Sequence, residues 1–206
     1  GRHVEVQLLG DGASAIHLGT RDCSIQRRFQ KLVEEAPAPA LPEAARTGLE
    51  QAAVRLARHL NYRGAGTAEF LVDADDFSFY FLELNARIQV EHPVTEAITG
   101  VDLVEQQLLV AMGKRMTLTQ DMVRPLGHAI EVRINAEDPA ADFRPAPGRV
   151  ASARWPAGPG VRVDSHITSG GEVPPFYDSL LGKLIVHGAS REEAVDRLAR
   201  ALAALK

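Results

Sequence analysis

The sequence predicts an α+β fold in which most strands are antiparallel. Strand-like segments follow one another across short turns at residues 3–19 and again at residues 65–84. Apolar residues recur at helical spacing in three places, over residues 42–60, 101–112 and 194–205. The chain has 206 residues, of which 45% are hydrophobic and 24% charged, so it contains enough apolar material for a real core.

The first expected element is a β-hairpin. Residues 3–8 alternate between polar and apolar side chains, as a strand with one buried face does. Glycines at positions 10 and 12 mark a turn, and residues 15–19 form the expected return strand. Because a strand pattern begins almost at the first residue, we expect the chain to be a segment of a longer protein.

A polar segment, a short strand and a helix are expected next. Residues 22–30 are polar and are expected to be irregular, whereas residues 31–35 have a strand pattern that the following prolines end. Pro42 suits the first turn of a helix, and apolar residues then recur at helical spacing. Residues 42–60 are therefore expected to form an amphipathic helix.

A second hairpin is expected from residues 65–72 and 77–84, which an acidic turn joins. If the hairpin turns symmetrically about Asp76, Glu69 lies opposite Glu83. Like charges in that position destabilise a strand pair, unless one carboxylate is protonated or a cation lies between them. The alternative is a solvated sheet face with two unrelated glutamates, because hairpin register is easily misjudged by one residue.

This hairpin also predicts a candidate metal site. Asn85 lies two residues beyond Glu83, so it points to the same face and adds a neutral oxygen ligand. Two carboxylates and an amide are hard oxygen donors, which favour Mg²⁺ or Mn²⁺ over Zn²⁺. Such sites commonly leave coordination positions open for substrate phosphates.

A dense run of polar side chains follows the hairpin and indicates a functional site rather than a core. Arg87 and Gln89 continue the parity of Asn85 if the chain stays extended. Arg87 is either an anion or oxyanion contact or a surface ion pair. Glu91 can act as a general base if a neighbour holds it deprotonated, and His92 is expected to be structural.

Lys31 and Cys23 each have a functional and a structural interpretation. Lys31 follows the basic run Gln26-Arg27-Arg28, and it is either a phosphate contact or part of a solvated basic surface. Cys23 is the only cysteine, so an internal disulfide is excluded, and a buried small residue is its expected role. A lone cysteine fits a reducing compartment, which we expect to be the cytoplasm.

A helix and a strand lead to an expected domain boundary. Helical spacing predicts a helix over residues 101–112, with Gly113 as its C-terminal stop. Residues 127–135 have a strand pattern, and a proline- and glycine-rich change of composition follows. We therefore expect two domains, residues 1–126 and residues 127–206.

Short segments and one helix make up the rest of the chain. The segments are residues 149–155, 160–167 and 182–188, separated by glycine and proline. Ser190 and Glu193 form the capping-box pattern S-x-x-E, which begins a helix. The net charge of −4 gives no reason to expect a nucleic acid or an anionic membrane as a partner. No apolar run approaches the roughly 20 residues that a membrane span needs.

Five segments spread over the whole chain carry a family resemblance, and the most specific one contains LELNARIQVEHPVTE. The segments are residues 21–39, 62–71, 81–108, 131–139 and 174–186. They resemble the biotin carboxylase component of biotin-dependent carboxylases. This resemblance implies the second half of an ATP-grasp domain followed by a biotin carboxylase C-terminal domain. It also implies that the family's N-terminal domain and most of its nucleotide-clamping lid lie outside this sequence.

The resemblance implies roles for individual residues. The implied metal ligands are Glu69, Glu83 and Asn85. The implied ATP-binding residues are His3, Gln26, Leu71, Glu69 and Glu83. The implied bicarbonate-binding residues are Lys31, Arg87, Gln89 and Val90, the last through its backbone. The implied catalytic residues are Arg87, Glu91 and Lys31.

The implied reaction is ATP-dependent carboxylation of biotin with bicarbonate, through carboxyphosphate. Glu91 would deprotonate bicarbonate, Arg87 would stabilise the enolate of biotin, and Arg133 would bind biotin or the released phosphate. The implied partners are a biotin carboxyl carrier protein or domain, a carboxyltransferase and a second copy in a homodimer. The final acceptor, such as acetyl-CoA, propionyl-CoA, pyruvate or urea, stays open.

Two alternatives remain beside this interpretation. The chain is either part of another ATP-grasp ligase, such as a carbamoyl phosphate synthetase, or a non-catalytic fragment or assembly module. The isolated segment is expected to be inactive in either case. The family usually has histidine in QRRHQK where this chain has Phe29, whose ring has no hydrogen-bonding nitrogen. A nucleotide contact made by that histidine would be lost or replaced by packing.

Overall fold

One antiparallel sheet of eight strands runs through the computed structural model, which describes all 206 residues. Its strand order is β10-β12-β6-β3-β2-β1-β4-β5. The strands are β1 (Arg2–Asp11), β2 (Ala15–Arg27), β3 (Gln30–Ala36), β4 (Arg63–Val72), β5 (Phe79–Asn85), β6 (His128–Asn135), β10 (Val161–Ser165) and β12 (Leu180–Gly188). All of the neighbouring pairs are antiparallel, so the predicted α+β class is confirmed.

Four α-helices and two small ribbons complete the structure. The helices are α1 (Glu43–His59), α2 (His92–Thr99), α3 (Leu103–Ala111) and α4 (Arg191–Ala204). The ribbons pair β7 (Glu137–Asp138) with β8 (Arg144–Pro145) and β9 (Gly148–Arg149) with β11 (Glu172–Val173). Single 3-10 turns are η1 (Gln120–Met122) and η2 (Pro139–Ala141). None of the helices combines the length and the apolar character that crossing a membrane demands.

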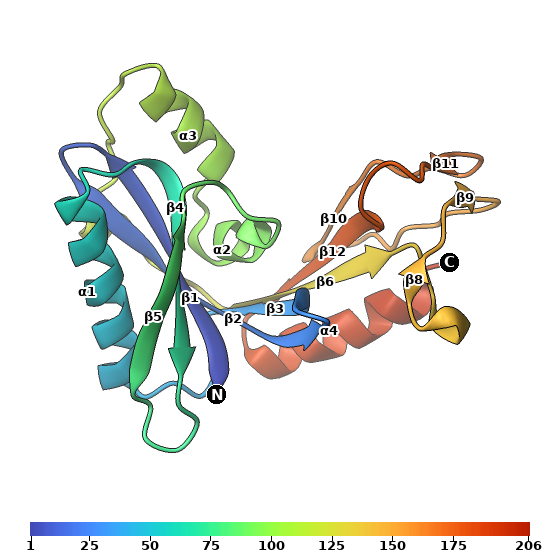
Figure 1. Ribbon diagram of the computed structural model, residues 1–206, viewed down its shortest axis with the longest axis horizontal. Coiled ribbons are helices and arrows are strands. Elements are labelled where there is room, and N and C mark those ends of the chain that lie inside the picture. The colour runs from blue at the N-terminus through green and yellow to red at the C-terminus, as the bar shows by residue number, and fades with distance from the viewer.

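The two ends of the sheet form two lobes, which β2, β3 and β6 join (Figure 1). Helix α1 packs on β1 and β4 through a buried cluster that includes Leu49, Val6 and Phe70. Helix α4 packs on β6 and β12 through Ala194 and Ala201. Helix α2 lies between the lobes, where its apolar side packs against β3, β6 and β12.

Most predicted elements are confirmed, including both hairpins and the helices over residues 42–60, 101–112 and 194–205. The expectation of an irregular segment at residues 22–30 is wrong, because β2 continues to Arg27. Its polar residues stay in the sheet because residues 22–27 pair with β3. Polar composition alone therefore did not mark a loop here.

Helix α2 was not expected from the sequence. Its eight residues, HPVTEAIT, begin with histidine and proline and are rich in β-branched side chains, so their helical pattern is weak. Gly100 ends the helix in a left-handed conformation, with φ of 70°. Of residues 149–155, only Arg149 belongs to a strand, in β9.

The β4–β5 hairpin has the predicted register, with Glu69 directly opposite Glu83. A bulge follows, because Phe70 pairs with Phe81 and leaves Leu82 as an extra residue on β5. Glu69 and Phe70 face opposite sides of the sheet because they are neighbours on β4, and the extra residue on β5 brings Glu83 to the side of Glu69. It thereby separates the apolar end of the hairpin from its polar end.

Candidate active site

A polar cleft of about 350 Å³ brings together almost all of the predicted site residues. Those lining it are His3, Gln26, Lys31, Glu69, Glu83, Asn85, Arg87, Gln89, Val90, Glu91 and Arg133. Leu71 is the exception: it lies outside the cleft, two residues beyond Glu69 on β4, with 43% of its surface exposed. The cleft is built from the ends of several strands and the loop before α2, so residues far apart in sequence meet there.

Glu69 lies at the centre of the cleft and accepts four side-chain hydrogen bonds. The donor-acceptor distances are 2.6 Å to Gln89, 2.7 Å to His3, 3.1 Å to Lys31 and 3.2 Å to Asn85. Burial by itself raises the pKa of Glu69, but the bond from His3 and the charge of Lys31 outweigh it and lower the pKa to about 2. Glu69 is therefore a fixed negative charge at neutral pH.

The hairpin residues fit a divalent cation. The Asn85 amide nitrogen lies 2.8 Å from a Glu83 oxygen and 3.2 Å from a Glu69 oxygen, so all three groups converge on one point. If the Asn85 amide turned by 180°, its oxygen would face the same point as the two carboxylates. Two opposed carboxylates and an amide oxygen are ligands that Mg²⁺ and Mn²⁺ prefer.

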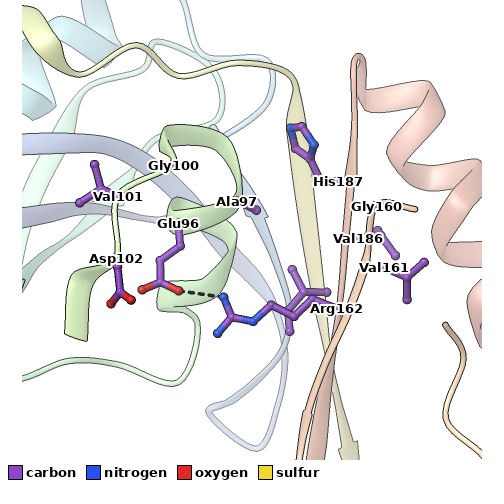
Figure 2. A pocket seen from close by; sticks show the side chains of 11 residues that line it. Glu96, Ala97, Gly100, Val101, Asp102, Gly160, Val161, Arg162, Val186 and His187 are labelled. Carbon is purple, nitrogen blue, oxygen red and sulfur yellow. Dashed lines mark hydrogen bonds and ion pairs between the residues drawn. The ribbon is translucent and has the colours of Figure 1, made fainter. Parts of the chain in front are cut away.

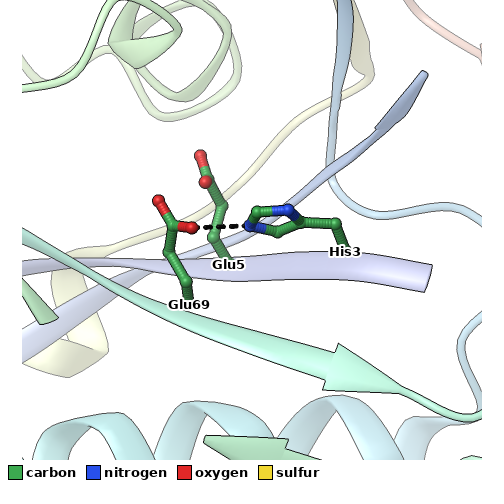
Figure 3. A group of neighbouring side chains, drawn as sticks. All are labelled: His3, Glu5 and Glu69. Atoms are coloured by element: carbon green, nitrogen blue, oxygen red, sulfur yellow. Dashed lines mark hydrogen bonds and ion pairs between the residues drawn. The ribbon is translucent and has the colours of Figure 1, made fainter. Parts of the chain in front are cut away.

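Two other groups of possible metal ligands lie close by. His3, Glu5 and Glu69 have ligand atoms within 4.8 Å of one another, and Figure 3 shows the imidazole aimed at the Glu69 carboxylate. The second group is Glu5, Cys23 and Glu91. Burial raises the pKa of the Cys23 thiol well above its ordinary value, which disfavours the thiolate that a metal would need.

Lys31 connects two carboxylates that line the cleft, Glu69 and Glu91, with the fully buried carboxylate of Glu5. Its Nζ lies 2.6 Å from Glu5, 2.6 Å from Glu91 and 3.1 Å from Glu69. Burial alone lowers the pKa of Lys31, but Glu5 and Glu91 more than offset this effect and raise it well above the ordinary value. The solvated basic surface that was the alternative for Lys31 is therefore excluded, because the side chain is largely buried among carboxylates.

Glu91 is placed directly before α2 and is almost fully buried. One of its oxygens accepts from Lys31 at 2.6 Å, and the other accepts from Arg133 Nη2 at 3.0 Å. Burial raises its pKa, but the charges of Lys31 and Arg21 dominate and lower the pKa to about 2. Glu91 is thus ionised and able to accept a proton.

Arg87 lies in the loop between β5 and α2, and its guanidinium makes no ion pair. Its one hydrogen bond is to the Ile88 carbonyl, at 3.2 Å. Because β5 ends at Asn85, the expectation that Arg87 and Gln89 continue one extended face is wrong. The turn leaves Arg87 exposed at the cleft and buries Gln89 against Glu69.

A buried network beneath the cleft was missed by the sequence reasoning. Arg21 is fully buried and donates to Glu5 at 2.5 Å, to Gln7 at 2.6 Å and to Thr95 at 2.8 Å. The polar positions of the alternating first strand carried this signal, but alternation does not show whether the polar face is covered. Gln89 before α2 and Thr95 within it cover this face and contact Arg21.

The second half of the chain also lines the cleft. Besides Arg133, it contributes Asn135, Asp178, Ser179 and Leu180. Asp178 and Ser179 lie in the PPFYDS segment, whose polar end was the available signal. Phe29 stands at the rim with 98% of its surface exposed, so its ring does not pack against the nearby side chains.

A second, more apolar cleft of about 430 Å³ lies between the end of α2 and β10. Figure 2 shows the Glu96 carboxylate and the Arg162 guanidinium meeting across it, at 2.8 Å. Arg162 also bonds Asp164 at 2.8 Å through its Nε. No predicted site residue lines this cleft.

Two family models match the chain. Residues 1–119 match the carbamoyl-phosphate synthase L chain, ATP binding domain, and residues 131–206 match the biotin carboxylase C-terminal domain. The antiparallel sheet with its polar cleft thus belongs to the ATP-grasp class of nucleotide-binding proteins. The chain is a member of the biotin carboxylase family.

Curated relatives support this membership over nearly the whole chain. The chain is 59% identical to a biotin carboxylase from Nostoc sp., over 98% of the chain and 45% of that protein. It is 54% identical to a biotin carboxylase from Pseudomonas aeruginosa, over 98% of the chain and 44% of that protein. The chain therefore spans a little under half the length of these relatives.

Solved structures have the same fold. The biotin carboxylase domain of 2-oxoglutarate carboxylase from Hydrogenobacter thermophilus superposes with a TM-score of 0.96 at 48% identity, over 100% of the chain and 45% of that domain. That structure is a dimer in complex with MgADP, ADP and bicarbonate. Urea carboxylase from Kluyveromyces lactis gives a TM-score of 0.95 at 47% identity, over 100% of the chain and 18% of that protein.

Proposed function

We propose that the intact protein containing this chain carboxylates biotin with bicarbonate, using ATP and passing through carboxyphosphate. The observation that carries the proposal is the position of Lys31, which joins Glu69 and Glu91 in one cleft beside the unpaired Arg87. Carboxylates that can hold a metal ion, cations that can hold an anion and an ionised base are thereby within reach of one small substrate.

Bicarbonate would bind between the two cations of the cleft. Lys31 and Arg87 supply positive charge, Gln89 supplies an amide, and the backbone of Val90 completes the set. The Val90 carbonyl accepts from Lys183 Nζ at 2.8 Å, which fixes the backbone at this point. A planar guanidinium is suited to two-point contact with an oxyanion such as bicarbonate.

ATP would lie on the open side of the cleft, toward β4 and β5. His3, Gln26 and the exposed Leu71 would contact the nucleotide, and Gln26 is held by a 3.0 Å bond to the His3 ring. Glu69, Glu83 and Asn85 would hold Mg²⁺ or Mn²⁺, which supplies charge neutralisation at the phosphates when bound. The complex of the Hydrogenobacter domain with MgADP supports the binding of a magnesium nucleotide.

Glu91 is the proposed base. In the structure Lys31 and Arg133 hold its carboxylate, so its pKa of about 2 makes it a weak proton acceptor. Bound bicarbonate would also interact with Lys31, so Lys31 would stabilise the Glu91 carboxylate less. The pKa of Glu91 would then rise toward the range in which it takes the substrate proton. The deprotonated oxygen then attacks the γ-phosphorus of ATP, forming carboxyphosphate and releasing ADP.

The second step uses the arginines of the cleft. Carboxyphosphate would break down to CO₂ and phosphate, the phosphate would take the N–H proton of biotin, and the biotin nitrogen would then attack CO₂. Arg87 has no carboxylate partner, so its charge is free to stabilise the enolate oxygen of biotin. Arg133 would contact biotin or the released phosphate from the opposite side of the cleft.

The partners and domain division also belong to the proposal. Biotin would arrive on a carrier protein or domain, and a carboxyltransferase would use the product. The dimer of the Hydrogenobacter domain supports a homodimer. A division into residues 1–126 and residues 127–206 is supported by family matches that end at residue 119 and resume at residue 131. The lone, buried Cys23 supports a cytoplasmic location.

The decisive experiment is Glu91→Gln in the intact protein. The amide cannot take a proton from bicarbonate, so bicarbonate-dependent ATP cleavage should fall by on the order of 10²- to 10⁴-fold. Glu105→Gln, at an exposed position of α3, is the matched control and should keep full activity.

Free biotin separates this function from that of a carbamoyl phosphate synthetase. Biotin should stimulate ATP hydrolysis by a biotin carboxylase, whereas the other ligase should ignore it. Full activity in Glu91→Gln, or hydrolysis that biotin leaves unchanged, would contradict the proposed function.

A further inference from the structure

Two fully buried glutamates lie opposite each other beside the cleft. Glu34 on β3 and Glu131 on β6 are register partners in the sheet, and both have 0% of their surface exposed. Neither has a role in the proposed reaction. Directly opposed like charges destabilise a strand pair, and a buried carboxylate without a partner is strongly disfavoured.

The oxygens of this pair are incompletely satisfied. One oxygen of Glu34 accepts from Arg133 Nε at 2.7 Å. The other oxygen of Glu34 and both oxygens of Glu131 have no hydrogen-bond donor although they are buried. A carboxyl group that keeps its proton becomes a donor. A proton on Glu131 would therefore provide a donor for the unsatisfied oxygen of Glu34.

The surrounding charges favour one proton on the pair rather than none. The charged groups that act on it are Arg133 on β6, Lys183 on β12, Glu91 directly before α2, and Glu5 on β1. Lys183 also donates to the Val90 carbonyl at 2.8 Å and lies 3.6 Å from Asp164.

The two glutamates differ in their preference for the proton. Burial raises the pKa of Glu131 well above its ordinary value, and the charge of Glu34 adds to this effect. Burial raises the pKa of Glu34 to about 7, although Arg133 opposes the shift. Glu131 is therefore the proton carrier, and Glu34 is the group that ionises near neutral pH.

Arg133 links this pair to the proposed base. Its Nε donates to Glu34, and its Nη2 donates to Glu91 at 3.0 Å. We propose that Glu34 is a positioning residue for Arg133, and that a proton held by Glu131 keeps the pair singly charged. A single charge matches the one guanidinium, whereas a doubly charged pair would pull Arg133 away from Glu91. The inference rests on the proposed function, since Arg133 matters through the substrates it contacts.

Two variants of the intact protein test the positioning role. Glu131→Gln keeps a donor toward Glu34, as the protonated acid does, so kcat should stay within about twofold of the unmodified protein. Glu34→Gln keeps an acceptor for Arg133 but loses the charge, so kcat should fall on the order of tenfold to a hundredfold. KM for ATP should change little, because the nucleotide lies on the other side of the cleft.

The pH dependence of kcat separates positioning from a general loss of structure. Activity that rises with the ionisation of Glu34 near pH 7 should lose this limb in Glu34→Gln and keep it in Glu131→Gln. An unchanged kcat and pH profile in Glu34→Gln would overturn the positioning role. So would equal losses of activity in both variants.

Infrared spectroscopy tests the proton without turnover. At a pH well above the value of about 7 at which Glu34 ionises, the unmodified protein should show the carbonyl stretch of one buried, protonated carboxyl group. The band should persist in Glu34→Gln and disappear in Glu131→Gln. Its absence from the unmodified protein, or its persistence in Glu131→Gln, would overturn the proton assignment even if Glu34→Gln did not fold. Because the band needs no catalysis, a failure of the proposed function is distinguishable: bicarbonate-dependent ATP cleavage would be missing while the band remained.

Discussion

The cationic residues of the cleft differ in whether a carboxylate pairs with them. Lys31 and Arg133 are fully engaged with carboxylates, whereas Arg87 has only a backbone carbonyl as its partner. A cation without a counter-ion contributes little to folding, and it is available to a substrate. Replacing Arg87 should therefore lower activity without lowering stability, which makes it the clearest residue to test.

Arg87→Ala should leave the melting temperature unchanged and reduce kcat for biotin carboxylation by on the order of 10²- to 10³-fold. The loss follows from removing the only unpaired cation that faces the cleft. Steady-state kinetics and a thermal melt on the same sample measure both effects. Arg124→Ala, an exposed arginine outside the cleft, is the matched control. Equal kcat values for the two variants would refute the role of Arg87.

The lowered pKa of Glu69 predicts how stability depends on pH. A carboxyl group with a folded pKa of about 2 and an ordinary value of 4.5 adds stability that is present above pH 4.5 and lost as the pH falls through about 2. The free energy of unfolding should therefore decrease between these values, as urea titrations measure. Glu69→Gln should flatten the slope, and Glu83→Gln on the exposed strand is the comparison. A slope that Glu69→Gln leaves unchanged would contradict the ion-pair explanation.

For single residues, the sequence predicted the positions of those side chains that depend only on nearby residues. The pairing of Glu69 with Glu83 was predictable from nearby residues, although the strands do not pair symmetrically about Asp76 next to the turn and the bulge at Leu82 restores the register. Glu5 and Arg21 could not be placed in this way. Their burial depends on α2 and the loop before it, which cover this face of the sheet, and alternation within one strand does not report what covers its polar face.

Among the elements, long and regular ones were predicted best. Helix α1 has 17 residues with a repeated apolar face, whereas α2 has eight residues and a proline in its first turn. The short helix nevertheless sets the site, because its first turn fixes Glu91 while Thr95 reaches the buried Arg21. Tertiary packing against β3, β6 and β12 holds α2 in a place that helical propensity alone does not specify.

Leu49→Ala tests how strongly α1 supports the sheet below the cleft. Leu49 is fully buried on α1 and belongs to the cluster that covers β1 and β4. Its truncation should reduce the free energy of unfolding by about 2–5 kcal/mol, measured by urea denaturation. Gln51→Ala, on the exposed side of the same helix, should change it by less than about 0.5 kcal/mol. A loss at Leu49 no larger than at Gln51 would show that α1 is loosely packed.

At the scale of the whole molecule, the chain contains one side of the proposed site. It spans 45% of the Nostoc relative, so the groups that the remaining part of such a protein supplies are separate from this chain. We expect the purified 206-residue chain to carboxylate biotin at a negligible rate, measured as bicarbonate-dependent ADP release. A turnover rate close to that of the intact protein would refute this expectation.

The pairing of β3 with β6 has a consequence for the way the molecule holds together. Residues 33–36 pair with residues 129–132, so the hydrogen-bond ladder crosses the proposed boundary at residues 126 and 127. Separating the two parts there would expose a row of unpaired N–H and C=O groups on each, and such open edges recruit other strands. The boundary in the sequence is thus no boundary for unfolding. The two parts are expected to gain and lose structure as one cooperative unit, and neither is a module that evolution or engineering can exchange without supplying a new edge partner.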